Sequence, residues 1–89
     1  KGKFVDCSNL TFKFLITSEK ERKISFIVPK SVAKKAVKRN YLRRLGYFAL
    51  QKHFNSLPFG IIGVFIFKKY QDDISIIENE IKNIFNKIN

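Results

Sequence analysis

The sequence predicts an α+β fold, a mixed four-stranded sheet packed with helices. Three observations support this class. Short segments with strand-like alternation precede residue 29, a basic amphipathic stretch runs from Pro29 to His53, and an apolar strand and an acidic-capped helix follow. The expected order is strand, strand, strand, helix, strand, helix. The 89 residues contain no linker, repeat or low-complexity segment, so we expect one domain over residues 1–89.

The N-terminal third alternates polar and apolar residues with a period of two. Residues 1–6 predict a short edge strand, Leu10–Thr17 a second strand and Lys23–Val28 a third, which Pro29 ends. The polar segment SEKERK separates the second and third strands. Its length favours an antiparallel hairpin with a loop of about five residues. We therefore expect these two strands to pair directly.

The basic stretch predicts a helix from about Ala33 to His53, after a turn that Ser31 can cap. Its apolar stripe consists of Val37, Tyr41, Leu45 and Phe48, with Leu42 and Ala49 beside them. We expect this stripe to be buried. Gly46 lies inside the helix, where it costs about 1 kcal/mol relative to Ala. Either a neighbour packs closely against this glycine or the helix bends there.

The same helix and the turn before it are strongly cationic. The stretch contains no acidic residue, and its bases are Lys30, Lys34, Lys35, Lys38, Arg39, Arg43, Arg44 and Lys52. The arc away from the apolar stripe holds Ala36, Arg39, Asn40, Arg43, Arg44 and Tyr47. Arginine forks suit paired phosphate oxygens, and an Asn amide can reach a phosphate, a 2′-OH or a base edge. The alternative is a solvated face kept for solubility, but such a face would interleave acids with its bases.

Two apolar segments complete the chain. Gly60–Phe67 is apolar on both alternations, which predicts an interior, parallel strand covered on both faces, after a loop at residues 55–59. Asp72 or Asp73 can cap a final helix. Its stripe consists of Ile74, Ile77, Ile81, Ile84 and Ile88. Barely two heptads are present, so we expect packing against the sheet rather than a coiled coil.

Composition restricts the chemistry. The net charge of +11 and pI near 10.1 favour a polyanionic partner, with nucleic acid the leading class. Cys7 is the only cysteine and is expected to be a small, buried or half-exposed side chain. His53, the only histidine, is expected at a helix C-terminus, favoured by the helix dipole. We predict no metal site and no catalytic residue. With neither a signal peptide nor a long apolar run, we expect a cytoplasmic protein without a membrane partner.

The motif KKAVKRNYLRR resembles the signature of the protein subunit of bacterial ribonuclease P. Its parts here are the small-apolar step Ala36-Val37, the pair Arg39-Asn40 and the bases Arg43-Arg44. The segment FIVPKSVAKKAV resembles the family's strand and Lys-rich loop, and IIGVFIFKK and the last helix follow in the family's order. The similarity extends over about residues 2–88.

The resemblance implies an RNA-binding subunit for tRNA 5′-end maturation, with the fold of ribosomal protein S5 domain 2 and a left-handed β-α-β crossover. Residues implied to bind the catalytic RNA are Arg39, Asn40, Arg43, Arg44, Lys30, Lys34, Lys35, Lys38 and Tyr47. Lys13 and Lys68 are candidates for a cleft that holds the 5′ leader of precursor tRNA. Cleavage would belong to the RNA with its Mg2+, and no obligate protein partner is implied.

The chain departs from the family at several points. Tyr47 stands where a further Arg is usual, and Phe48 where an acid is common. The family's N-terminal helix is absent from these 89 residues, and we expect a segment to precede Lys1 in the natural protein. Two other functions stay open: a general DNA- or RNA-binding module, and a membrane-surface or scaffold protein. A strand before the basic helix argues against a helix-turn-helix, and apolar residues needed for the core argue against membrane binding.

Overall fold

The structure is a computed structural model that describes residues 2–57 and 60–88. Its strands are β1 (Lys3–Asp6), β2 (Leu10–Ile16), β3 (Arg22–Ile27) and β4 (Ile61–Phe67), and its α-helices are α1 (Ala36–Gln51) and α2 (Ile74–Ile88). A short 3-10 helix at Phe54–Ser56 follows α1, inside the segment predicted as a loop. Lys1, Pro58 and Phe59, which also carried predictions, lie outside the described residues. The predicted fold class and element order are confirmed.

The four strands form one mixed sheet in the order β1-β2-β4-β3. β2 pairs antiparallel with both β1 and β4, whereas β3 pairs parallel with β4. The predicted hairpin between β2 and β3 is therefore wrong, because β4 lies between them. β4 is the most apolar strand, and an interior place pairs its backbone on both sides, while the more polar β3 takes an edge.

Gly60 shows how β4 enters the sheet between β2 and β3. Its carbonyl accepts from the Thr17 N–H at 2.6 Å, and its own N–H donates to the Glu21 carbonyl at 2.8 Å. A Cβ at Gly60 would lie 2.4 Å from the Thr17 oxygen, and its φ is +80°. Only glycine fits this position without strain. The short connection after β2 therefore wraps around the start of β4 and does not close a hairpin.

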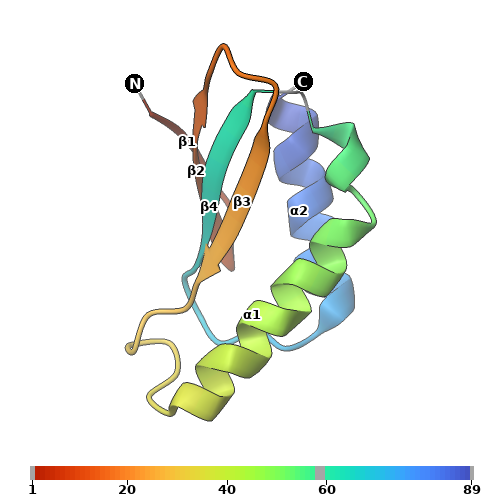
Figure 1. Cartoon of the computed structure of the whole chain (residues 1–89). Coiled ribbons are helices and arrows are strands. Elements are labelled where there is room, and N and C mark those ends of the chain that lie inside the picture. The colour runs from red at the N-terminus through yellow and green to blue at the C-terminus, as the bar shows by residue number, and fades with distance from the viewer. Residues whose placement is uncertain (1, 58–59, 89) are drawn as a thin grey trace.

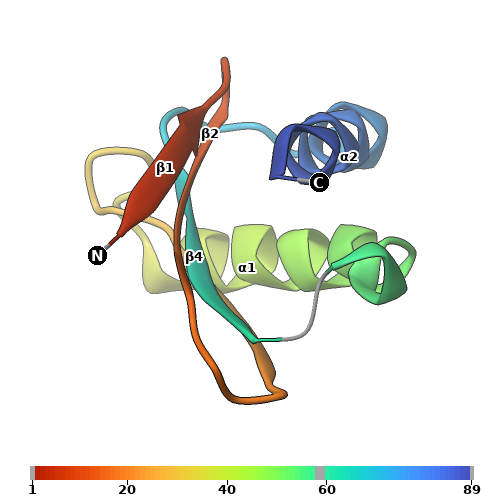
Figure 2. The same cartoon turned by 90° about the horizontal axis from the view of Figure 1, so that it is seen from above.

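Both helices cover the same face of the sheet, as Figures 1 and 2 show. α1 crosses from β3 to the parallel strand β4, and α2 returns along α1 and β2. The parallel, interior position predicted for β4 is thus confirmed. The left-handed sense of the crossover stays a prediction of the resemblance.

The core lies between this sheet face and the two helices. At its centre the rings of Phe12, Phe65 and Phe26 occupy paired positions on β2, β4 and β3. Their centroids are 4.3 Å apart for Phe12 and Phe65 and 4.9 Å apart for Phe26 and Phe65, and both pairs are stacked. From α2, the buried residues are Ile77, Ile81, Ile84 and Phe85. The final helix therefore packs its isoleucine stripe inward, as predicted.

The buried side of α1 agrees with the predicted one only in part: Leu42 and Ala49 are buried and Leu45 is partly buried against the core, as expected, but the rest of the stripe is not. Its buried residues are Leu42, Gly46, Ala49 and Leu50. In contrast Val37 is 75% exposed, Tyr41 42% and Phe48 58%. The reason is close packing, because a Cβ at Gly46 would lie 2.5 Å from the Phe26 ring. Only the side with Gly46 and Ala49 can approach the sheet this closely, so the large residues are left outside. Gly46 therefore has a close neighbour, the Phe26 ring, which was one of the two predicted explanations for a glycine inside this helix.

The second face of β4 is also not covered as predicted. Ile62 is 40% exposed, and Val64 and Ile66 are partly exposed among the described residues. Across the sheet they align with Leu15 and other residues that face away from the helices. We call this surface the open sheet face. Its exposed apolar residues are Phe4, Leu15, Ile27 and Ile62. The sequence marked β4 as apolar on both sides but could not show what covers each side.

Glu80 of α2 fastens the turn between β1 and β2. Its carboxylate accepts from the backbone N–H groups of Asn9 and Leu10 at 3.0 and 3.1 Å, and from the Asn9 amide at 2.5 Å. At the start of α2, the Ser75 N–H donates to Asp73 Oδ1 at 2.9 Å. Asp73 is thus the predicted cap. Glu80 therefore fixes α2 to the turn between β1 and β2, and Asp73 caps the first turn of α2.

Candidate nucleic-acid interface

The N-terminal end of α1 concentrates positive charge. The helix begins at Ala36, three residues later than predicted, and Lys35 at its N-cap position makes no side-chain capping bond. Ser31 lies too far upstream to cap it, in a turn that the Val32 and Ala33 N–H groups close onto the Pro29 carbonyl. The first turn contains no acid. The helix dipole and the nearby lysines therefore add their positive potentials, which favours an anionic ligand.

The lysines of this end are all exposed: Lys30, Lys34, Lys35 and Lys38. Lys34 precedes the helix, and Lys38 lies one turn before the buried Leu42 with its own side chain exposed. Within the described residues, the ion pairs involve other cations, namely Lys23, Lys52, His53 and Lys68. The charge at the start of α1 is thus not neutralised by carboxylates within the described part of the chain.

Arg39 connects the helix to this lysine-bearing turn. Its Nη1 donates to the carbonyl oxygens of Ala33 at 3.0 Å and Lys34 at 2.7 Å. Both hydrogens of Nη1 are thereby used, while Nη2 and Nε can still donate to a phosphate. Arg39 therefore holds the turn in place and keeps part of its fork for a ligand.

The next turn carries Asn40, Arg43 and Arg44. Arg43 is half-buried and its Nη2 donates to Asn40 Oδ1, while Asn40 and Arg44 are exposed. The Asn40 amide NH2 is left as a donor when its oxygen is engaged in this way. The structure thus brings Arg39, Asn40, Arg43 and Arg44 onto one arc of α1, next to the lysines. We call this surface the cationic face.

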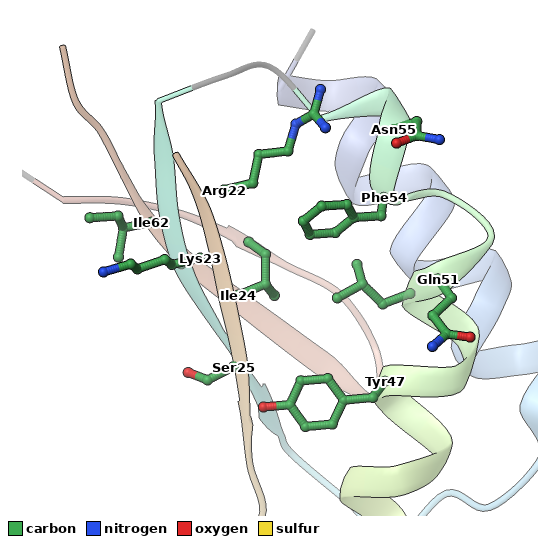
Figure 3. Close-up of a pocket in the computed structure, with 11 residues that line it drawn as sticks. Arg22, Lys23, Ile24, Ser25, Tyr47, Gln51, Phe54, Asn55 and Ile62 are labelled. Atoms are coloured by element: carbon green, nitrogen blue, oxygen red, sulfur yellow. The ribbon is translucent and has the colours of Figure 1, made fainter. Parts of the chain in front are cut away.

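Tyr47 extends the cationic face into a groove between α1 and β3, shown in Figure 3. Its ring meets Phe26 edge-on, with centroids 4.9 Å apart, and is 41% exposed. The groove has a volume of about 640 Å³, and its apolar lining includes Ile24, Leu50 and Phe54. Arg22 lies at its far end, with its guanidinium 5.5 Å from the centre of the Phe54 ring. Tyr47 is therefore placed beside the basic residues with its ring held by packing.

A second group of aromatic residues on α1 was missed by sequence reasoning. Tyr41 and Phe48 were assigned to the core, but both rings are exposed and border a hollow with Arg44. The sequence signal that could have found them is Gly46. A glycine in mid-helix indicates the side of closest packing, which places Tyr41 and Phe48 away from it.

The two candidate leader-binding lysines lie in different settings. Lys13 is exposed in the middle of β2, paired in register with Val64. Lys68 follows β4, and its Nζ donates to both carboxylate oxygens of Asp6 at 3.0 Å and to the Cys7 carbonyl at 2.9 Å. The Thr11 hydroxyl and then Lys68 hold the pKa of Asp6 below its ordinary value. Lys13 is thus free of this pair, whereas Lys68 shares its charge with Asp6.

His53 and Cys7, the remaining candidates, have surroundings typical of structural residues. His53 lies two residues after the end of α1, with Nε2 3.6 Å from Glu78 Oε1. Cys7 is half-buried, as expected, and burial raises the pKa of its thiol. Residues 2–57 and 60–88 contain no cluster of three or more metal-ligating side chains. Over the same residues, no helix has the length and apolar character needed to cross a membrane.

A family model described as Ribonuclease P matches residues 1–89, which is the whole chain. The chain belongs to the ribonuclease P protein family. The resemblance seen in residues 36–44 is therefore confirmed. As a member of this family, the chain is an RNA-binding subunit of an endoribonuclease and acts in tRNA 5′-end processing. A search of curated proteins gives no match.

Solved structures of ribonuclease P proteins share the fold. The protein from Thermotoga maritima is 19% identical with a TM-score of 0.87, and the match covers 100% of this chain and 86% of that one. Its complex with 1-(4-fluorophenyl)-2-thiourea gives 19% identity, a TM-score of 0.86, and 100% and 88% coverage. The protein from Staphylococcus aureus is 14% identical with a TM-score of 0.76, over 98% of this chain and 81% of that chain. At these identities, the matches support the fold alone.

Proposed function

We propose that the cationic face and the lysine-bearing turn bind the catalytic RNA of ribonuclease P. The observation that carries this proposal is the arrangement around Arg39. One guanidinium fixes the turn carrying Lys34 and Lys35 to the helix carrying Asn40 and Arg43. A preorganised set of cations loses less side-chain entropy on binding phosphates than separate, mobile side chains.

The open sheet face is the proposed binding surface for the single-stranded 5′ leader of precursor tRNA. It offers exposed apolar side chains, a central Lys13 and, at its end, Lys68. Unpaired bases present aromatic faces for which such a surface is suited, and the lysines can neutralise phosphates. This surface is on the opposite side of the sheet from α1, so catalytic RNA and leader would bind without competing for one surface.

In this proposal the RNA performs cleavage with Mg2+, and the protein neutralises phosphates and positions the substrate. The described side chains provide many cations and few groups suited to acid–base chemistry, with His53 beside Glu78 at the far end of α1. Such a subunit acts in the cytoplasm, where tRNA precursors are processed. The protein's contribution should therefore be largest when Mg2+ is too scarce to screen RNA phosphates alone.

The test is cleavage of a precursor tRNA by a bacterial ribonuclease P RNA at low Mg2+. Adding this protein is expected to restore cleavage at the 5′ end by at least about tenfold, because the cationic face replaces part of the screening by Mg2+. Product length on a gel identifies the site. Lack of stimulation at every protein concentration, together with equal affinity for duplex DNA, would favour a general nucleic-acid-binding module.

A single substitution tests the role of Lys68. Replacing Asp6 by Asn removes the carboxylate that neutralises Lys68 and is expected to tighten binding of precursor tRNA by about two- to threefold, since one more cation becomes available. The binding constant is measured with and without the 5′ leader. As a control, Thr11→Val removes the other partner of Asp6 but leaves its charge. An equal gain on leaderless tRNA would place Lys68 outside the leader surface.

A further inference from the structure

Tyr41, Arg44 and Phe48 lie on one side of α1, separated by three and four positions. Residues with this spacing are neighbours on a helix surface. Tyr41 is 42% exposed and Phe48 is 58% exposed, and together with Arg44 they border a hollow of about 450 Å³. The two rings are about 10 Å apart along the helix axis, with the guanidinium between them. We call this surface the aromatic side of α1.

The charge around this surface indicates what can cover it. α1 contains no acidic residue, and Glu78 of α2, which faces the end of α1, is paired with Lys52 at 3.3 Å. Lys52 also lies over the Phe48 ring, with Nζ 5.9 Å from its centroid. A second copy of the chain would bring another +11 net charge to this surface. An anionic partner with flat apolar groups is therefore favoured over self-association.

A lipid surface fits the same surface poorly. An interfacial helix needs a wide, continuous apolar face. Here the exposed apolar residues are Val37, Tyr41, Tyr47 and Phe48, and Arg44 interrupts them. Alternation of aromatic rings with a guanidinium is instead the pattern that binds unpaired bases, because rings stack on bases and the cation pairs with the phosphate.

We infer that the aromatic side of α1 is a second RNA contact. Tyr41 and Phe48 each stack on an unpaired base of the catalytic RNA, and Arg44 binds a phosphate between these bases. The inference rests on the proposed function, since it assumes that α1 meets that RNA. It adds a base-stacking surface beside the cationic face, formed by residues that sequence periodicity assigns to the core.

Substitutions at both rings test this inference by binding to a bacterial ribonuclease P RNA. Tyr41→Ala and Phe48→Ala are each expected to weaken binding about tenfold, because one stacked base is lost. Both side chains are exposed, so thermal unfolding should change little. The salt dependence of binding should stay the same for these variants. Arg44→Ala should instead lower the slope of log K against log salt by about 0.7 to 0.9, since one phosphate contact is removed.

Conservative variants separate stacking from simple apolar burial. Tyr41→Phe should bind as the unchanged protein does, whereas Phe48→Leu should lose nearly as much affinity as Phe48→Ala. Phe48→Trp adds the only tryptophan, because the chain has none. Its fluorescence should be quenched when the RNA binds and stacks on the indole. Unchanged fluorescence at saturating RNA, or full affinity of Phe48→Leu, would overturn the inference.

Two further measurements distinguish the catalytic RNA from the other candidate occupants of the aromatic side of α1, a second copy of the chain and a membrane. If the unchanged protein stimulates cleavage while Tyr41→Ala and Phe48→Ala bind the RNA equally well, the inference fails and the proposed function stands. If the unchanged protein neither binds nor stimulates the RNA, both fail. Loss of dimerisation in sedimentation, or loss of binding to phosphatidylglycerol vesicles, in Phe48→Ala with unchanged RNA affinity would assign this surface to a second copy or to a membrane.

Discussion

Gly46→Val is expected to lower the free energy of unfolding by roughly 3 kcal/mol, because the added side chain has no room beside Phe26. A Cβ at position 46 would lie 2.5 Å from two atoms of that ring. Phe26 is 4% exposed and stacked on Phe65, so it cannot turn away without disturbing the centre of the core. Urea denaturation followed by circular dichroism measures the loss. It is large for a domain whose total stability is typically 5–15 kcal/mol.

A matched control and a double-mutant cycle identify the cause. Ala36→Val introduces the same side chain at an exposed position of α1 and should cost less than about 1 kcal/mol, which is the difference in helix propensity. Combining Gly46→Val with Phe26→Leu should give a loss smaller than the sum of the single changes. Strictly additive losses would contradict the close contact between Gly46 and Phe26 as the reason for the glycine.

The same contact explains why periodicity identified α1 but only part of its buried side. The helix has two apolar arcs, one with Val37, Tyr41 and Phe48, the other with Leu42, Ala49 and Leu50. Area burial alone favours the arc with larger side chains. The structure selects the other arc because Gly46 and Ala49 allow α1 to approach β3 and α2 closely. The packing distance of the helix therefore determines which arc of α1 is buried. A single sequence indicates this distance only through its small residues.

The sheet was likewise predicted only in part. Alternation and turn residues were sufficient to predict the strands and their order along the chain, and the isoleucine spacing was sufficient for α2. The pairing of the strands could not be predicted from loop length. A short loop after β2 is compatible with a hairpin between β2 and β3, and also with the observed structure, in which the loop wraps around Gly60. The open sheet face was hidden for another reason. An apolar residue such as Ile62 looks the same in sequence whether a helix or a ligand covers it.

The basic residues of the site were easier to find because charge does not depend on packing. The sequence placed Arg39, Asn40, Arg43 and Arg44 on one arc, and the structure brings them together. It could not show that Arg39 also binds the carbonyls of Ala33 and Lys34. That bond depends on where the helix begins, and boundaries are the least certain part of a sequence interpretation. The structure thus gives Arg39 two roles, in shaping the site and in binding phosphate.

These two roles predict a large effect for the double replacement Arg39→Ala with Arg43→Ala. Affinity for the catalytic RNA is expected to fall about 100-fold, since each charge-assisted hydrogen bond to a phosphate contributes at least about 1.5 kcal/mol. The slope of log K against log salt should decrease by roughly 1.5, because two phosphate contacts are lost. Filter binding at several salt concentrations measures both quantities, and the stimulation of precursor tRNA cleavage at low Mg2+ should fall in parallel.

Two control variants separate the effect of the charge of Arg39 from the effect of its side-chain shape. Lys20→Ala removes an exposed base in the turn between β2 and β3, outside both surfaces of α1, and should change affinity less than about threefold. Arg39→Lys keeps the charge, but one ammonium cannot bind both carbonyls and a phosphate with the geometry of the fork. It should therefore retain the salt slope yet bind more weakly. Full affinity of Arg39→Lys would mean that Arg39 acts as a charge alone and that its bonds to Ala33 and Lys34 do not shape the site.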